Sequence, residues 1–136
     1  MINFQDFILF TLSKANQRVY GTFKGRLQPY GLTPIQALVL HALYEEEGLS
    51  AGELGKRLAL DSATLSGVLD RMAESGWIIK NVKEDRRALN IRLSDKSHQY
   101  RDKFLKETEK VNHEVLSRFN AEERFLLIRM LKDLRK

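Results

Sequence analysis

The sequence predicts a mainly α-helical fold with one small β-hairpin, an α+β class, built as a single domain. Two observations carry this prediction. Apolar residues recur at helical spacing through most of the chain, but from Trp77 the period becomes the alternation of a strand. The polar stretch KEDRRA, residues 83–88, divides that alternating part in two, as the tip of a hairpin does. The length of 136 residues fits one core.

Capping residues, prolines and glycines mark the ends of six predicted helices. Thr33 precedes Pro34 as an N-cap precedes a proline at the first helical position. Ser50, Asp61 and Ser94 stand before later helices as further caps. The predicted helices span about 3–28, 34–47, 50–58, 62–75, 95–118 and 120–136. Three short helices followed by a charged hairpin make a winged helix-turn-helix lobe at about 32–93, and the segments at about 1–30 and 94–136 remain as flanking helices.

The fourth helix is the element that enters the DNA major groove in a helix-turn-helix. A turn of about 100° per residue places an apolar face of this helix toward the core. The opposite face and its flanks carry small, hydroxyl-bearing or basic side chains, which suit close approach to base edges and phosphates. The candidate DNA-binding residues of this helix are Ser62, Ala63, Thr64, Ser66, Gly67 and Arg71. The alternative is an ordinary solvent-exposed helix face.

Positive charge is concentrated around the hairpin. The chain carries a net charge of +5, and the segment 80–101 holds seven basic against three acidic residues, a net of +4. A basic tip beside a groove-reading helix suits the minor groove, where narrow A·T stretches concentrate negative potential. Asp85 can pair with Arg87 and aim its guanidinium. The candidate DNA-binding residues of the tip are Lys83, Asp85, Arg86 and Arg87. The alternative is an edge hairpin charged against sheet aggregation.

Several classes of site are excluded or disfavoured. The absence of cysteine excludes disulfides, thiolate zinc sites and cysteine nucleophiles. Three scattered histidines predict no metal site, and no nucleophile–base pair, phosphate loop or paired carboxylate predicts a catalytic residue or a cofactor. No apolar run approaches the ~18 residues of a membrane span, and the N-terminus lacks the features of a signal peptide. We therefore expect a cytoplasmic protein that is not an enzyme.

Both ends of the chain carry more apolar side chains than one helix face needs. Exposed apolar surface is costly at about 25 cal/mol per Å², and a second copy would cover it. We therefore expect a homodimer formed by the helices near 2–28 and 96–135, whose two-fold axis also suits an operator of two half-sites. The alternative is packing of the two termini on each other within one chain.

Four aromatic side chains could line a ligand cavity near the junction of the lobe and the flanking helices. They are Tyr30, His41, Tyr44 and Trp77. The alternative is that they are core residues.

With these features together, the chain resembles the MarR family of bacterial regulators over nearly its whole length. The stretches that carry the resemblance are GLTPIQALVLHAL, LSAGELGKRLALDSATLSGVLDRMAESGWI and KEDRRALNIRLSDKS. They include the D-x-R signature of the wing at residues 85–87 and an ending of the fourth helix, LDRMAESG, like the family's LDRLE-x-x-G. Gly67, where many members have a basic residue, and Ser97, where a glycine is frequent, depart from the family pattern.

The resemblance implies a triangular dimer whose first, fifth and sixth helices interlock and whose two lobes read a near-palindromic operator. Arg87 would enter the minor groove, oriented by Asp85. Members often repress transcription, and many release DNA when a small aromatic ligand binds between the dimerisation and DNA-binding regions. The sequence thus predicts a sequence-specific regulator of double-stranded DNA, with a winged-helix protein-interaction scaffold as the alternative.

Overall fold

The computed structural model describes residues 1–82 and 89–136 of the chain. Within these residues the chain forms helices and one pair of strands in an order close to the predicted one. In sequence they are η1 (Phe4–Asp6), α1 (Ile8–Leu27), η2 (Gln28–Tyr30), α2 (Pro34–Glu45), α3 (Ala51–Leu58), α4 (Ser62–Glu74), β1 (Ile78–Val82), β2 (Leu89–Leu93), α5 (Asp95–Val115) and α6 (Ala121–Leu134).

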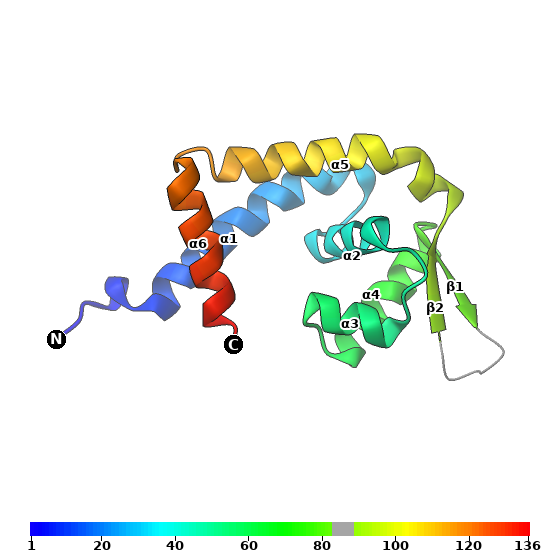
Figure 1. Ribbon diagram of the computed structural model, residues 1–136, viewed down its shortest axis with the longest axis horizontal. Helices are drawn as coiled ribbons and strands as arrows, with labels where there is room; N and C mark the ends of the chain where they lie inside the picture. Colours follow the sequence, from blue (N-terminus) through cyan, green and yellow to red (C-terminus); the bar gives the residue numbers. More distant parts are fainter. Residues whose placement is uncertain (83–88) are drawn as a thin grey trace.

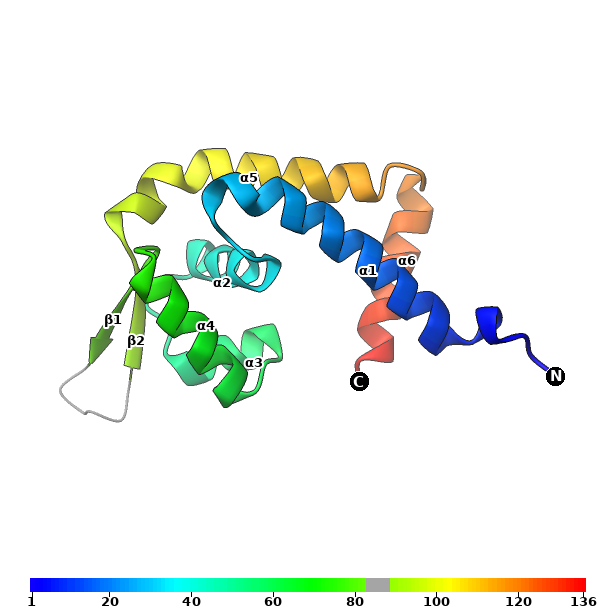
Figure 2. The ribbon, with the colours of Figure 1, turned by 180° about the vertical axis from the view of Figure 1, so that it is seen from behind.

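The long helix α5 lies along one side of the molecule, and the lobe and helix α6 project from its two ends in the same direction (Figure 1). At one end lies the lobe of α2, α3, α4 and the hairpin, and at the other end lies α6. Helix α1 slopes up to α5 and lies next to it at its C-terminal end, and the N-terminus extends away from the lobe, as the reverse view also shows (Figure 2). The lobe and the flanking helices are therefore distinct parts of one chain, joined through α1 and α5.

The lobe has a continuous apolar core. Leu43 of α2, Leu54 of α3, Met72 of α4 and Ile91 of β2 are each fully buried. Strands β1 and β2 are antiparallel, with Ile78 opposite Leu93. The loop before α3 extends this sheet, because the Ile91 N–H donates to the Leu49 carbonyl at 2.9 Å. These contacts hold the root of the hairpin against the three short helices.

The caps predicted at Thr33, Ser50, Asp61 and Ser94, and a further one at Asn120, set the starts of the helices. The side-chain oxygen of each of these five residues accepts a hydrogen bond from the backbone N–H three residues later. The prediction for the first helix was wrong at its start, because Asn3 caps the short helix η1 and Phe7 is extended. The fifth helix ends at Val115 instead of near 118, and turns fill the link to α6.

No helix in residues 1–82 or 89–136 combines the length and the apolar character needed to cross a membrane.

Candidate nucleic-acid interface

Helix α4 presents the predicted small and hydroxyl-bearing side chains to solvent. Its apolar residues Leu65, Val68, Leu69 and Met72 are buried in the lobe, as the helical period predicts. The candidate residues point the other way: Gly67 is half-buried, and the other five are exposed. Those five are Ser62, Ala63, Thr64, Ser66 and Arg71. The structure therefore brings all six candidates of α4 to one exposed side of the lobe.

The N-cap of α4 restricts what one of these hydroxyls can do. The Asp61 carboxylate accepts from the Thr64 N–H at 2.8 Å and from the Thr64 hydroxyl at 2.9 Å. The backbone hydrogen bond from Thr64, with help from its hydroxyl, holds the pKa of Asp61 below its ordinary value. Because the Thr64 hydroxyl donates its hydrogen bond to Asp61, it can only accept a hydrogen bond from another molecule. Ser62 and Ser66 are the hydroxyls of this face better placed to donate to phosphates or bases.

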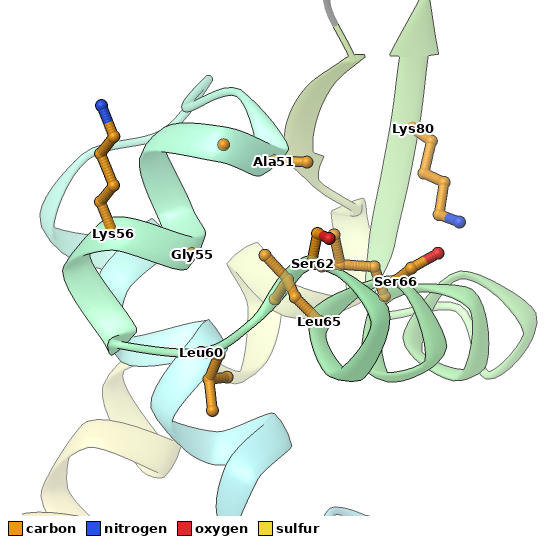
Figure 3. A pocket seen from close by; sticks show the side chains of 10 residues that line it. Ala51, Gly55, Lys56, Leu60, Ser62, Leu65, Ser66 and Lys80 are labelled. Atoms are coloured by element: carbon orange, nitrogen blue, oxygen red, sulfur yellow. The ribbon is translucent and has the colours of Figure 1, made fainter.

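A hollow of about 280 Å³ lies between α3 and α4 beside this face (Figure 3). Leu60 and Leu65 contribute to its apolar wall, and Ser62, Ser66 and Lys80 contribute polar groups. In Figure 3 the ends of Ser66 and Lys80 lie on the same side of the hollow. The strand β1 thus adds a cation to a surface that α4 supplies with hydroxyl groups.

Lys80 also reaches across to α4 and forms an ion pair with Asp70. The lysine side chain is 25% exposed and the aspartate side chain is 58% exposed. Sequence reasoning counted Lys80 among the basic residues near the hairpin but did not assign it to the site. The alternation of β1 places Lys80 in a strand, but only the packing of that strand on α4 shows that it meets Asp70.

Gly67 leaves space on the exposed side of α4. A Cβ atom added there would have no heavy atom within 4 Å. The helix backbone is therefore bare at this position, and a neighbouring molecule could approach it more closely than at a residue with a side chain.

The candidate residues of the hairpin tip lie outside the described residues. They are Lys83, Asp85, Arg86 and Arg87. Their role in DNA binding stays a prediction.

All four aromatic residues expected near a ligand pack against rings of α5, and His41, 5.1 Å from Phe104 between ring centroids, is among them. Phe104 of α5 is fully buried, and its ring lies 6.0 Å from the ring of Tyr30 and 5.8 Å from that of Tyr44, between centroids. The Trp77 ring lies 5.7 Å from that of Tyr100. Burial raises the pKa of Tyr44 to about 12. These contacts join the lobe to α5, and the part of these residues in ligand binding stays a prediction.

His41 is the one of the four that lines a groove of about 850 Å³ between α1, α2 and α5. Its Nε2 lies 2.8 Å from the Thr108 hydroxyl, which itself lies 3.0 Å from the Phe104 carbonyl oxygen. The two side chains share one hydrogen bond, whose donor depends on the tautomer of the imidazole. Burial lowers the pKa of His41 and favours the neutral ring. Apolar side chains of the same groove are Val19, Tyr20, Leu38 and Leu116.

Within residues 1–82 and 89–136, no three His, Cys, Asp or Glu side chains form a group that could hold a metal ion.

The terminal segments leave large apolar side chains in water. Ile8 is 64% exposed and Leu9 80%, while Phe125 and Leu134 of α6 are 68% and 57% exposed. Folding of a single chain therefore does not bury this surface, contrary to the alternative in which the termini cover each other.

Comparison with known proteins identifies the family of the chain. The family model described as "MarR family" matches residues 30–88. The regulator MgrA of Staphylococcus aureus is 32% identical over 111 residues, which cover 80% of this chain and 76% of MgrA. The chain belongs to the MarR family.

Two further regulators are similar to this MarR-family chain. The regulator TtmR of Methylorubrum extorquens is 38% identical over 99 residues, 72% of this chain, and the match spans about half, 49%, of TtmR itself. A solved structure of a probable transcriptional regulator from Pseudomonas aeruginosa is 30% identical, with a TM-score of 0.88 over 97% of this chain and 99% of that one. This MarR-family chain has the DNA-binding fold of a transcriptional regulator, and these relatives are named as regulators, not as enzymes.

Proposed function

We propose that this MarR-family protein is a sequence-specific regulator that binds double-stranded DNA as a homodimer and represses transcription from a near-palindromic operator. The observation that carries the proposal is the exposed side of α4, which presents small and hydroxyl-bearing side chains next to Lys80 of β1. Residues 62–71 would lie in the major groove, with Ser62 and Ser66 donating hydrogen bonds and Arg71 reaching a phosphate or a guanine. Arg87, oriented by Asp85, would enter the minor groove, and Lys83 and Arg86 would contact phosphates.

Dimerisation is supported by the apolar surface at the chain ends. Side chains such as Ile8, Leu9 and Phe125 are more than 60% exposed in the single chain. A second copy related by a two-fold axis would bury the same surface on both protomers. The two lobes would then face two half-sites, about one helical turn of DNA apart or a multiple of it.

Regulation by a small aromatic ligand is supported by the groove that includes His41. Its wall combines apolar side chains with the imidazole of His41, a combination that suits an aromatic molecule carrying a hydroxyl or amino group. The groove touches α1, α2 and α5. A ligand there would act where the lobe meets the flanking helices.

The test is a titration of the purified protein with its own upstream DNA and with a scrambled duplex, each at two salt concentrations. The proposal expects a preference for the upstream DNA at two chains per site, and an affinity that falls steeply with salt because neutralised phosphates release counterions. Equal, purely salt-driven binding to both duplexes would favour the protein-interaction scaffold instead.

The variant Arg87→Ala tests the assignment of the hairpin tip. It should weaken operator binding at least tenfold, a loss of about 1.4 kcal/mol, while sedimentation still shows the dimer. Lys103→Met is the control for loss of one exposed cation outside the proposed DNA interface, and because α5 belongs to the proposed dimer, sedimentation should show the same dimer for this variant. An unchanged operator affinity of Arg87→Ala would remove the tip from the interface.

A further inference from the structure

The side of α4 that the proposed function turns toward DNA carries a carboxylate near its centre. Among residues 62–71 the charged side chains are Asp70 and Arg71. At about 100° per residue, Asp70 falls between Ser66 and Gly67 on the exposed side of the helix. A free carboxylate at this position would repel the phosphates on both sides of the groove. An uncompensated Asp70 would therefore oppose the binding that the rest of the face favours.

The structure places a cation on that carboxylate. Lys80 pairs with Asp70 from β1, where its backbone lies opposite Ile91 in the strand register. Ile91 is fully buried, so the strand pair is anchored in the core of the lobe. Three quarters of the Lys80 side chain is also covered. The lysine is thus held by the lobe and differs from a mobile surface cation.

We propose that Lys80 is a positioning residue for DNA binding, which acts by cancelling the charge of Asp70 on the exposed side of α4. This inference rests on the proposed function. In the wild type the pair is neutral, so Lys80 is not itself a phosphate contact. Binding then depends on Lys80 through Asp70, and the two residues must act together.

Three variants separate this role from a direct phosphate contact. Lys80→Met removes the cation and leaves a bare carboxylate, so operator affinity should fall roughly tenfold or more. Asp70→Asn removes the carboxylate and frees Lys80, so affinity should equal or exceed that of the wild type. The double variant Asp70→Asn/Lys80→Met again has a neutral pair and should return to within about threefold of the wild type.

The salt dependence of affinity gives a readout that a merely structural pair would not change. Each neutralised phosphate contributes about 0.9 to the slope of log affinity against log salt. Asp70→Asn should steepen the slope by about 0.9 for each bound lobe, and the double variant should match the wild type. If Lys80 already contacts a phosphate, Asp70→Asn leaves the slope unchanged, the double variant is as weak as Lys80→Met, and the proposal is overturned.

Two controls keep the outcome clear. Lys80→Arg retains the ion pair and should preserve affinity. Lys103→Met removes an exposed lysine of α5, away from the exposed side of α4, and with the dimer shown intact by sedimentation it should change neither affinity nor slope. If circular dichroism shows that Lys80→Met is unfolded, the salt slopes of operator affinity for Asp70→Asn and for the double variant test the proposal on their own. A wild type that does not prefer its upstream DNA overturns the proposed function and this inference with it. A wild type that does, combined with additive effects of the two substitutions, overturns this inference only.

Discussion

Phe125 provides a quantitative test of the proposed dimer. Its side chain is 68% exposed on α6. Full burial of a phenylalanine side chain stabilises by about 1.5–3 kcal/mol, so burial of that exposed part is worth about 1–2 kcal/mol for each protomer. A two-fold interface contains the residue twice, which gives about 2–4 kcal/mol for Phe125→Ala. Since 1.4 kcal/mol is a factor of ten, the dimer dissociation constant should rise roughly 30- to 1000-fold.

Sedimentation equilibrium over a range of protein concentrations measures this constant for the wild type and the variant. Ile8→Ala, at a position 64% exposed on α1, should have an effect of the same sign. Ile79→Ala is the matched control, because Ile79 is 49% exposed on β1 and lies outside the terminal segments. A wild type that stays monomeric at micromolar concentration, or unchanged constants in both terminal variants, would refute the assignment of this surface to the dimer.

Other predictions concern stability and its dependence on pH. Asp61→Ala should lower the thermal midpoint of unfolding, whereas Asp61→Asn keeps an acceptor for the cap. Because hydrogen bonds from Thr64 lower the pKa of Asp61 in the folded state, the wild type should lose this stabilisation as pH falls below about 4, and Asp61→Asn should not. Burial lowers the pKa of His41, so the free energy of unfolding should be highest above about pH 6.5 and decline below it. His41→Gln should show a shallower decline, and parallel pH profiles for the variant and the wild type would contradict this. Gly76→Ala, at a φ of 83°, should destabilise by about 1–2 kcal/mol in urea titrations, whereas Gly21→Ala, in α1 with open space at the Cβ position, should stabilise by up to about 1 kcal/mol.

Much of the lobe could be predicted because its signals are local. A cap such as Thr33 accepts a hydrogen bond from a backbone N–H only three residues further along the chain. The buried and exposed sides of α4 follow from the helical period alone. The two strands likewise appear where the alternation of the sequence places them. The first helix shows the limit of local reasoning, since the apolar spacing continues through Phe7 while the backbone there is extended.

The residues that sequence reasoning missed depend on contacts between distant segments. Lys80 meets Asp70 only because β1 packs against α4, and no spacing in the sequence encodes that approach. Tyr30 and Tyr44 were expected near a ligand because they are aromatic and close to the junction. Their packing on Phe104 could be seen only once α5, some 60 residues further along the chain than Tyr44, had been placed.

The contacts of α5 explain how events in the flanking helices could reach the lobe. The Tyr44 hydroxyl donates to the Ser97 carbonyl at 2.6 Å, and the buried Ser97 hydroxyl donates to the Trp77 carbonyl, so both α2 and the start of the hairpin are attached to α5. At the other end of the junction, the Arg26 guanidinium donates to Glu107 at 3.0 Å and to Glu114 at 2.7 Å, which ties α1 to α5. In the proposed dimer, α5 would then be the element that links each lobe to the partner protomer. We expect that a ligand that moves α2 relative to α5 would shift the lobe, and with it the fit to two fixed half-sites, without contact with any residue at the DNA.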